Sequence, residues 1–544
     1  MKSLHFFIVF CALFSCCCSE VTANNEITIC EVKQKVNSTT HEYVAFNCTI
    51  ESDEHSAITF DFRPFSIIEQ IYFNQSRVAR MPREFFDTFE LAQQVNMSFV
   101  EMTTLGVDSF RRARVLKRLD LYGNHIESLI ERVFNGAKSL EVLNLTKNVV
   151  KEVHCDAFNG AVMLKKLYLG ENLIEELCET LIQSLVELEL FNVSHNRIHN
   201  LPIGFFDENL KLRSVDVSHN QIVAFNVAFP VKHLCYLNLN NNQILSVTLK
   251  FAGIEIDEDC ESPITLQADE NLITAIDLPE DYHPEILSLK FNALHDLCNI
   301  TNQLKLKHLF LSGNPLNEED IFQLTNLTNL VNLSLAHINI DRFDIRMLEG
   351  LSHKLLEFDI SDNALPQLDL SVIKMQELIR LNISNNRLMH IDEDYLRPHF
   401  PNLKYFDINN NRWGCQYLRG MIHISFKRQR INALPQKGHP QVKNRPNVDG
   451  IACLQELTTG HLEMFREQLE GLVKNIADES LGELKAEFTS SLSEITEENK
   501  CANEMQNRLT IFEERFKTLE GRLENLTQLN EQVMHRIIKL LDGE

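Results

Sequence analysis

An asparagine, or a residue that takes its place, returns every 24 residues along the first half of this chain, inside a constant apolar frame. In one copy, Leu116, Leu119 and Leu121 form the frame. Asn124 follows them, and Phe134 lies ten residues later. A unit of this size cannot bury its own leucines, so copies must stack and bury them against neighbours. The frame therefore predicts a solenoid in which the asparagine satisfies backbone groups where each strand bends. The recurring positions are Ser76, Val100, Asn124, Asn148, Asn172, Asn196 and Asn220.

The frame resembles the typical leucine-rich repeat of extracellular proteins, over residues 65–413 and about fifteen copies. The repeats predict an α/β solenoid, a leucine-rich-repeat horseshoe; with the cysteines and the C-terminal residues discussed below, we expect disulfide caps on this horseshoe and an α-helical coiled coil after it. A phenylalanine recurs at one offset and is expected to form an aromatic spine on the convex side, which accounts for part of the 34 phenylalanines. We call the recurring asparagine positions the ladder; its later members are Asn242, Asn271, Asn292, Asn314, Ile338, Asn363, Asn386 and Asn411. The expected spine comprises Phe86, Phe110, Phe134, Phe158 and Phe206, with Ile182 between Phe158 and Phe206.

The first residues indicate an extracellular protein. Residues 1–19 combine Lys2, an apolar run and small residues, which is typical of a secretory signal peptide, with cleavage as late as residue 23. No later stretch reaches the roughly 20 apolar residues of a membrane helix. We therefore expect a secreted product without a membrane span. The net charge of −24 argues against nucleic acid as a partner.

The remaining cysteines are even in number, which favours disulfides in a secreted chain. One pair should staple an N-terminal cap (20–64) and another a C-terminal cap (414–453), because terminal repeats otherwise expose an apolar face. A third pair lies one solenoid layer apart, and a fourth links a strand to an acidic insertion. A metal site is the alternative, but no C-x-x-C or Cys/His cluster supports it. The pairs are Cys30–Cys48, Cys415–Cys453, Cys155–Cys178 and Cys235–Cys260, which leaves Cys298 and Cys501 as candidates for an interchain bond.

Residues 454–544 lose proline and follow a heptad pattern, which predicts a helical coiled coil. Such a seam needs a partner chain, although folding back on the solenoid or pairing with an earlier helix is the alternative. Asn530 in the seam favours a two-stranded assembly with a fixed register. Cys501 either bridges two chains or is an unpaired thiol. The clean seam comprises Leu509, Phe512, Phe516, Leu519, Leu523, Leu526, Asn530, Val533, Ile537 and Leu540.

Glycosylation sequons bear on which face binds partners. Asn96, Asn144, Asn192 and Asn382 fall within the strand frame and should point from the concave face, with Asn332 beside it. If glycans occupy them, protein partners must use the lateral edges, the caps or the coiled coil. The complete set is Asn37, Asn47, Asn74, Asn96, Asn144, Asn192, Asn299, Asn326, Asn332, Asn382 and Asn525.

The sequence contains no catalytic motif, and we expect no enzyme activity, cofactor or metal. His195 and His219 each precede a ladder asparagine, one layer apart. One interpretation is a pH-sensitive or metal-binding pair. We favour the other interpretation, that both are simply polar and exposed. A cluster of basic residues has two interpretations. It is a site for nucleic acid or heparin, or it docks against the acidic coiled coil or an acidic partner. We favour docking. It comprises Lys427, Arg428, Arg430, Lys437, Lys443 and Arg445.

The end of the solenoid, with Asn411, Trp413 and Cys415, resembles the N-x-W-x-C junction of mosquito leucine-rich-repeat immune proteins. The whole order of parts looks like the long, coiled-coil-bearing members of that complement-control family. The resemblance implies a haemolymph scaffold that pairs with a second leucine-rich-repeat chain and holds a complement-like thioester protein. The family's adjacent interchain cysteine pair is missing here, so the resemblance leaves covalent pairing to Cys501 or Cys298.

Two other classes of protein share some of these features. An extracellular adhesion protein or receptor ligand would use the repeat face to bind protein. A secreted enzyme or inhibitor would need a reactive group or loop, and only the acidic insertion at 255–262 offers one.

Overall fold

The chain forms two compact units, Met1–Leu454 and Gln455–Glu544. The computed structural model describes residues 69–73, 75–81, 85–231, 234–254, 260, 262–279, 282–433 and 446–454, together with the backbone of four strands before residue 69. All of these belong to the first unit. The predicted coiled-coil seam and Cys501 lie outside the described residues.

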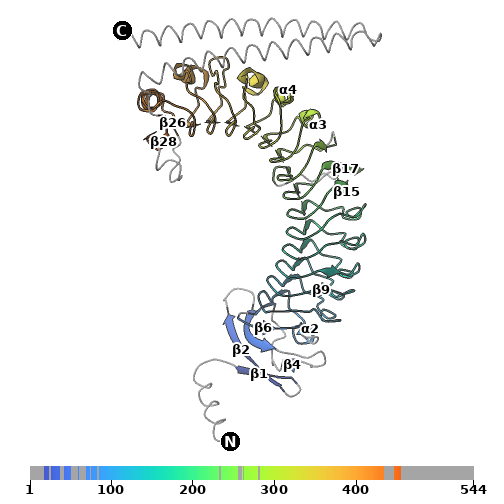
Figure 1. The fold of residues 1–544 in the computed structure, drawn as a ribbon. Helices are drawn as coiled ribbons and strands as arrows, with labels where there is room; N and C mark the ends of the chain where they lie inside the picture. The colour runs from blue at the N-terminus through green and yellow to red at the C-terminus, as the bar shows by residue number, and fades with distance from the viewer. Residues whose placement is uncertain are drawn as a thin grey trace, which may run out of the picture. The chain divides into compact units, whose positions relative to one another are not determined.

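Each repeat contributes one short strand to a continuous parallel sheet, and the repeats stack along a curve (Figure 1). The middle residue of each strand is buried and its neighbours are largely half-exposed, so one sheet face packs on the core. This is the predicted leucine-rich-repeat horseshoe. The strands are β5 (Gln70–Phe73), β7 (Gln94–Asn96), β8 (Arg118–Asp120), β10 (Val142–Asn144), β12 (Lys166–Tyr168), β13 (Leu190–Asn192), β14 (Ser214–Asp216), β16 (Tyr236–Asn238), β18 (Thr265–Gln267), β20 (Ile286–Ser288), β21 (His308–Phe310), β22 (Asn332–Ser334), β23 (Glu357–Asp359), β24 (Arg380–Asn382) and β25 (Tyr405–Asp407).

The ladder asparagines bond each layer to the one before it. Asn124 Oδ1 accepts the N–H groups of Val100 and Met102, both at 3.0 Å. Its Nδ2 donates to the carbonyls of Met97 and Leu121, at 2.8 and 2.9 Å. One buried amide therefore satisfies backbone groups of two repeats, as the sequence predicts. The arrangement recurs at Asn148, Asn172, Asn196, Asn220, Asn242, Asn271, Asn292, Asn314, Asn363, Asn386 and Asn411.

The ladder is interrupted where Ile338 takes the asparagine position. Its side chain is buried but cannot accept a hydrogen bond. The N–H of Leu316 in the preceding repeat donates instead to the carbonyl of Asn314, at 2.9 Å. The next layer resumes the pattern, since Asn363 Oδ1 accepts the N–H groups of Ile338 and Ile340. At Ile338 the missing amide is thus replaced by a local turn.

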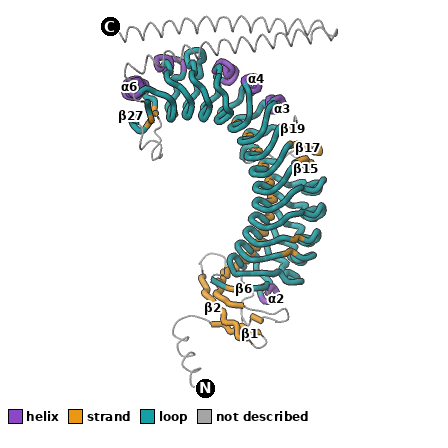
Figure 2. Tube along the Cα trace, viewed as in Figure 1, coloured by secondary structure: helices purple, strands orange, loops and turns teal. Residues whose placement is uncertain are grey.

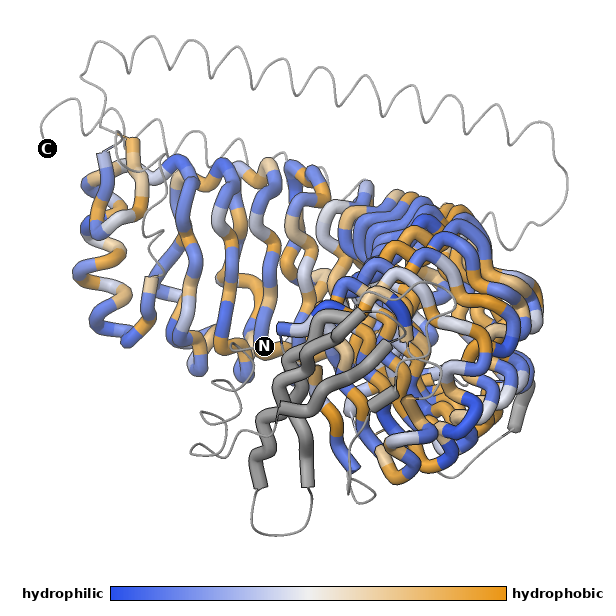
Figure 3. Tube along the Cα trace, turned by 90° about the horizontal axis from the view of Figure 1, so that it is seen from below, coloured by the Kyte–Doolittle hydropathy of each residue, from blue (hydrophilic) through white to orange (hydrophobic). Residues whose placement is uncertain are grey.

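Buried aromatic rings run along the convex side of the core. The predicted spine is present from Phe86 to Phe158, with ring centroids 5.7, 5.2 and 5.8 Å apart at successive steps. Phe206 then continues it into residues that the sequence did not indicate, with centroid distances of 5.1 to 5.9 Å at Phe229, Phe251 and Tyr282. Apolar and polar residues alternate around each turn (Figure 3). The leucines and these rings together form one core along the solenoid.

The return arcs are mostly loop and turn, with short strands and helices (Figure 2). Strands β15 (Phe225–Val231) and β17 (Ser246–Ile254) are longer and lie on the outer side of the curve (Figure 1). Pro230, which has no N–H, accompanies a register shift in β15. The outer strands are β6 (Arg77–Val78), β9 (Ser128–Leu129), β11 (Glu152–Val153), β15 (Phe225–Val231), β17 (Ser246–Ile254) and β19 (Ala275–Asp277). The helices are α2 (Phe85–Thr88), α3 (Cys298–Thr301), α4 (Glu318–Gln323), η1 (Leu324–Asn326), η2 (Ile345–Leu351), η3 (Glu393–Tyr395) and α5 (Leu396–His399).

The N-terminal cap is an antiparallel sheet made of β1 (Cys18–Ala23), β2 (Glu26–Val36), β3 (Glu42–Ile50) and β4 (Thr59–Phe60). Strand β3 also pairs in parallel with β5, which joins the cap to the repeats. The register sets Cys30 opposite Cys48. Strand β1 begins at Cys18 and so overlaps the end of the segment predicted as a signal peptide.

The C-terminal cap closes the last repeat. Trp413, the only tryptophan in the sequence, is fully buried there, and its Nε1 donates to the carbonyl of Ile408 at 2.7 Å. Strand β26 adds to the edge of the repeat sheet, and the last two strands form a hairpin. The cap elements are α6 (Cys415–Gly420), the π-helix η4 (Met421–Phe426), α7 (Lys427–Gln429), β26 (Asn432–Ala433), β27 (Asn447–Val448) and β28 (Ile451–Ala452).

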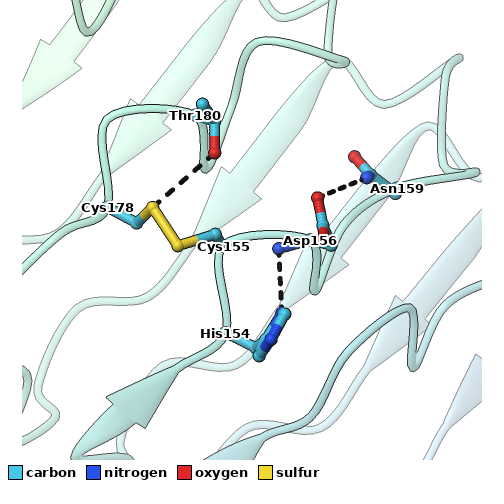
Figure 4. The surroundings of a disulfide bond; sticks show 6 residues. All are labelled: His154, Cys155, Asp156, Asn159, Cys178 and Thr180. Carbon is cyan, nitrogen blue, oxygen red and sulfur yellow. Dashed lines mark hydrogen bonds between the residues drawn. A yellow bond between two sulfur atoms is a disulfide. The ribbon is translucent and has the colours of Figure 1, made fainter.

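Three of the proposed cysteine pairs are disulfides in the described residues: Cys155–Cys178, Cys235–Cys260 and Cys415–Cys453. The first joins adjacent repeats across a Cα–Cα distance of 5.3 Å (Figure 4). Hydrogen bonds fix the loop beside it, where the N–H of Asp156 donates to His154 Nδ1 at 3.1 Å and Asn159 Nδ2 donates to Asp156 Oδ1 at 2.7 Å (Figure 4). This disulfide therefore sits in an ordered loop.

Candidate interaction surface

The sheet face opposite the core is lined by polar side chains that bond across layers. Asn144 Nδ2 donates to Asp120 Oδ1 in the preceding repeat at 3.1 Å. Ser288 Oγ donates to Asp269 Oδ1 at 2.6 Å, and Asn192 reaches Asp216 at 3.5 Å. These groups partly satisfy one another, so the face is a fixed polar surface. This face offers hydrogen-bonding groups to a partner.

Four sequon asparagines lie on this polar face. Asn96, Asn144, Asn192 and Asn382 each end a strand and are half-buried. In three of them the sequon hydroxyl donates to the asparagine Oδ1, at 2.7 to 2.9 Å. These hydrogen bonds orient the three side-chain amides, and Asn192 Nδ2 also donates to Asp216 Oδ2 at 3.5 Å. Glycosylation of these sites stays a prediction.

The other sequons are dispersed. Asn332 lies in β22, and its Nδ2 donates to Glu357 at 3.2 Å. Asn299 and Asn326 are exposed, in α3 and at the end of η1. Asn47 lies in β3. Asn37, Asn74 and Asn525 are outside the described residues.

Aromatic side chains gather where the sheet turns into the return arc. Phe99 and Phe291 each precede a ladder position, with φ of 55° and 51°. Their side chains are 61% and 51% exposed. The Phe99 ring packs edge-on against Tyr122 at 5.1 Å, and Phe291 lies 6.1 Å from His337. We call Phe99, Tyr122, Phe291 and His337 the aromatic edge.

A glycine in the next repeat makes room for each exposed phenylalanine. A Cβ atom on Gly123 would lie 2.5 Å from the Phe99 ring, and one on Gly313 would also collide with Phe291. Both glycines have positive φ, 68° and 76°. Sequence reasoning missed this surface. The signal that would have found it is a phenylalanine before a ladder position with glycine at the same offset one repeat later.

His195 and His219 stack, with ring centroids 3.9 Å apart and planes inclined by 9°. Both side chains are exposed, as the favoured sequence interpretation expects. Burial, followed by the neighbouring His195, lowers the pKa of His219, against the opposing effect of Asp216 and Glu270. Among the described residues, no group of three or more His, Cys, Asp or Glu side chains is arranged to hold a metal ion.

Cys298 is an exposed free thiol at the start of α3. Its Sγ donates to Gln323 at 3.5 Å. A side-chain hydrogen bond with Asp296 raises the pKa of the Cys298 thiol and lowers that of the Asp296 carboxyl. The thiol is therefore disfavoured as a nucleophile, because the thiolate is the reactive form. Cys501, the other candidate for an interchain bond, is outside the described residues.

Of the basic cluster, Lys427, Arg428 and Arg430 lie in α7 and at its end. Lys437, Lys443 and Arg445 are outside the described residues. No helix in the described part of the chain has the length and apolar character to cross a membrane.

Known proteins match the repeats and the overall architecture. The leucine rich repeat family model matches residues 114–174 and 138–198. The protein flightless-1 homolog of Caenorhabditis elegans is 34% identical over 83 residues, a match that spans 15% of this chain and only 7% of that protein.

Two solved structures share the fold. The first is the crystal structure of the LRIM1/APL1C complex, with a TM-score of 0.54 and 17% identity, covering 94% of this chain and 89% of the matched chain. The second is the APL1 leucine-rich repeat domain, with a TM-score of 0.52 and 18% identity, covering 76% of this chain and 98% of that domain. Repeat frame, asparagine ladder, parallel sheet and these matches agree: the chain folds as a leucine-rich-repeat solenoid.

Proposed function

We propose that this protein is a secreted leucine-rich-repeat scaffold of innate immunity, which pairs with a second leucine-rich-repeat chain through its coiled coil. The observation that carries the proposal is the extent of the structural likeness. The likeness to a chain of the LRIM1/APL1C complex spans 94% of this chain, whereas the isolated APL1 repeat domain spans 76%. The larger match extends beyond the repeats. The residues beyond them include the predicted heptad seam.

Several features support secretion. Disulfides such as Cys155–Cys178 and Cys415–Cys453 persist in oxidising compartments. The matched complex and the mosquito family that the sequence resembles both consist of leucine-rich-repeat proteins. The partner chain in our proposal is therefore of the same architecture, as a homodimer or a heterodimer.

The cargo in this proposal is a complement-like thioester protein. The support is the resemblance of the solenoid end to the mosquito family, together with the structure of that end: Trp413 is fully buried and Cys415 is bonded to Cys453. This closure stabilises the cap that precedes the predicted coiled coil in the sequence, and pairing of the helices would bring two solenoids to one cargo.

The pairing is tested first on the secreted full-length chain, by light scattering and by gels run with and without reductant. Leu526→Glu places a charge in the predicted seam and should convert a dimer to monomers. Gln528→Glu adds the same charge at a predicted outward position and should leave the dimer intact. A covalent dimer lost in Cys501→Ser, but kept in Cys298→Ser, would assign the interchain bond. A monomeric wild-type chain, alone and with leucine-rich-repeat partner chains, would refute the pairing.

The cargo is tested separately with a purified complement-like thioester protein. Wild-type dimer should bind it and slow the loss of its thioester to methylamine, whereas the Leu526→Glu monomer should do so less. A dimer that neither binds nor protects the thioester protein would leave a paired scaffold with a different cargo.

One observation favours a second function, adhesion or receptor-ligand binding through the repeats. Phe99 and Phe291 are exposed on the aromatic edge, where apolar side chains are typical of protein contacts. Substituting both with serine would abolish cell-surface binding under this alternative, and would leave coiled-coil pairing unchanged.

A further inference from the structure

Two neighbouring repeats carry the same dipeptide at the same place in the return arc, Asn135–Gly136 and Asn159–Gly160. Both glycines have a positive φ, of 108° and 101°. A Cβ atom on Gly136 would lie 2.5 Å from the carbonyl oxygen of Arg111 in the preceding repeat, so only glycine fits there. A Cβ atom on Gly160 would lie 3.1 Å from Asn135 Oδ1. Stacking of the repeats therefore places the two Asn-Gly pairs side by side.

An asparagine that precedes glycine reacts with its own backbone, because no Cβ atom on the glycine hinders the approach. The glycine amide nitrogen attacks Cγ of the asparagine side chain, and the new N–Cγ bond closes a succinimide ring. The Cγ–Nδ2 bond breaks, and the side-chain nitrogen leaves as ammonia with the proton of the attacking N–H. Water then adds to either carbonyl of the ring, which leaves aspartate or isoaspartate.

The reacting groups of Asn135 and Gly136 are not restrained by hydrogen bonds. Within the described part of the chain, the carbonyl of Asn135 accepts no hydrogen bond and the N–H of Gly136 donates none. The Asn135 side chain is exposed, and its amide has no hydrogen-bond partner among the described residues either. This peptide group therefore turns toward the attacking geometry without breaking a hydrogen bond of its own.

Asn159 has a similar backbone but a restrained side chain. Its Nδ2 donates to Asp156 Oδ1 at 2.7 Å (Figure 4), and the residue is half-buried. This hydrogen bond to a carboxylate must break before Cγ meets the nitrogen of Gly160. The negative charge of Asp156 also disfavours loss of the amide proton, which makes the nitrogen nucleophilic. Both effects slow the reaction at Asn159.

We propose that Asn135–Gly136 is a site of spontaneous deamidation in the folded protein, and that Asp156 protects Asn159–Gly160 from the same reaction. Water is the only co-reactant. The isoaspartate product adds a negative charge and one backbone methylene between Phe134 and Ala137, whose side chains are fully buried. A packed core absorbs such a lengthening poorly, so the reaction weakens one layer of the solenoid as the protein ages.

The test is a time course of the full-length secreted protein at mildly alkaline pH, followed by reduction, trypsin digestion and mass spectrometry. Trypsin separates the two sites, into peptides 133–138 and 152–165. Fragmentation by electron transfer distinguishes isoaspartate from aspartate. Asn135 should convert about tenfold faster than Asn159, or more, because only Asn159 must first lose a hydrogen bond to a carboxylate. Mildly acidic pH should slow the reaction at Asn135, since the attack requires a deprotonated nitrogen.

Three controls assign the difference to the fold. In urea-unfolded protein the two asparagines should convert at nearly equal rates, because the contact with Asp156 is lost. Asp156→Ala should bring the rate at Asn159 to within a few-fold of that at Asn135. Glu152→Ala removes an exposed carboxylate of the same repeat that has no hydrogen bond to Asn159, and should leave Asn159 protected. Circular dichroism melting verifies that both variants fold.

Two results would overturn the proposal. Equal rates at Asn135 and Asn159 in the folded protein would show that the contact with Asp156 protects nothing. An unchanged Asn135, after a time in which the unfolded chain converts completely, would show that the folded turn protects both sites. Neither result depends on whether the protein forms dimers, so the proposed function is tested independently.

Discussion

The imidazole rings of His195 and His219 lie face to face, 3.9 Å between centroids, at equivalent positions of adjacent repeats. Both residues have a φ of 53°, so the left-handed turn before each ladder asparagine sets the rings in register. When both rings are protonated, two like charges meet at van der Waals distance. The stack is therefore most favourable with at least one ring neutral.

The first prediction concerns pH. The folded-state pKa of His219 is lowered, so the unfolded chain binds more protons than the native one as pH falls below the ordinary histidine value of about 6.5. The stabilising contribution is present above that pH and is lost as pH falls through the lowered pKa. His219→Gln should make the urea midpoint less sensitive to acid between pH 7.5 and 5. The exposed His353→Gln is the control, and an equal response in both variants would contradict the prediction.

The second prediction concerns the ladder. Asn172→Ala removes the acceptor for the N–H of Val150 and the donor to the carbonyls of Leu145 and Leu169. These backbone groups are buried between layers, so the variant should lose about 1–3 kcal/mol of unfolding free energy. Chemical denaturation followed by circular dichroism measures the loss. The exposed Asn302→Ala should change stability by less than about 0.5 kcal/mol, and a similar small effect at Asn172 would contradict the bonding role.

The repeated features were predictable because they depend on spacing alone. Asn124 and Phe134 recur in one frame, and Cys155 and Cys178 lie at nearly the same offset in adjacent repeats, so stacking brings each set together. The outer strand β15 was not predicted, since the return arc has no fixed frame and its pairing with β17 depends on neighbouring layers. The basic cluster seen in the sequence includes Arg428 but not Arg397, which lies beside it in the C-terminal cap. Arg397 and Arg428 belong to different irregular segments, which only the cap brings together.

The third prediction concerns the disulfide between repeats. Cys155 and Cys178 close a loop with a sequence separation of 23 residues. Restricting an unfolded loop of that length stabilises the folded state by about 3 kcal/mol in the chain-entropy model. Replacing both cysteines with serine should lower unfolding free energy by about 2–4 kcal/mol, measured by denaturation without reductant. Adding reductant to the double variant tests the remaining disulfides separately. A loss below about 1 kcal/mol would mean that the reduced chain keeps these repeats together.

The fourth prediction concerns the aromatic edge. Gly123→Ala places a methyl group against the Phe99 ring and imposes a side chain at a φ of 68°. We expect a loss of about 1–3 kcal/mol, from steric displacement and backbone strain together. In a Phe99→Ala background the same change should cost less, because only the backbone term of about 1 kcal/mol remains. A double-mutant cycle from urea denaturation separates the two terms. Equal costs in both backgrounds would show that the ring moves aside freely.

The fifth prediction concerns glycans on the polar face. Asn96, Asn144, Asn192 and Asn382 are partly exposed at strand ends, on the face opposite the core. We expect the secreted protein to carry glycans at these sites, which would shield the sheet from protein partners and leave the edges and caps for binding. Mass spectrometry after enzymatic deglycosylation in heavy-oxygen water identifies each occupied asparagine, with Ser194→Ala as a variant that removes one sequon. Bare asparagines at all four positions would refute the shielding and return the polar face to the candidates for partner binding.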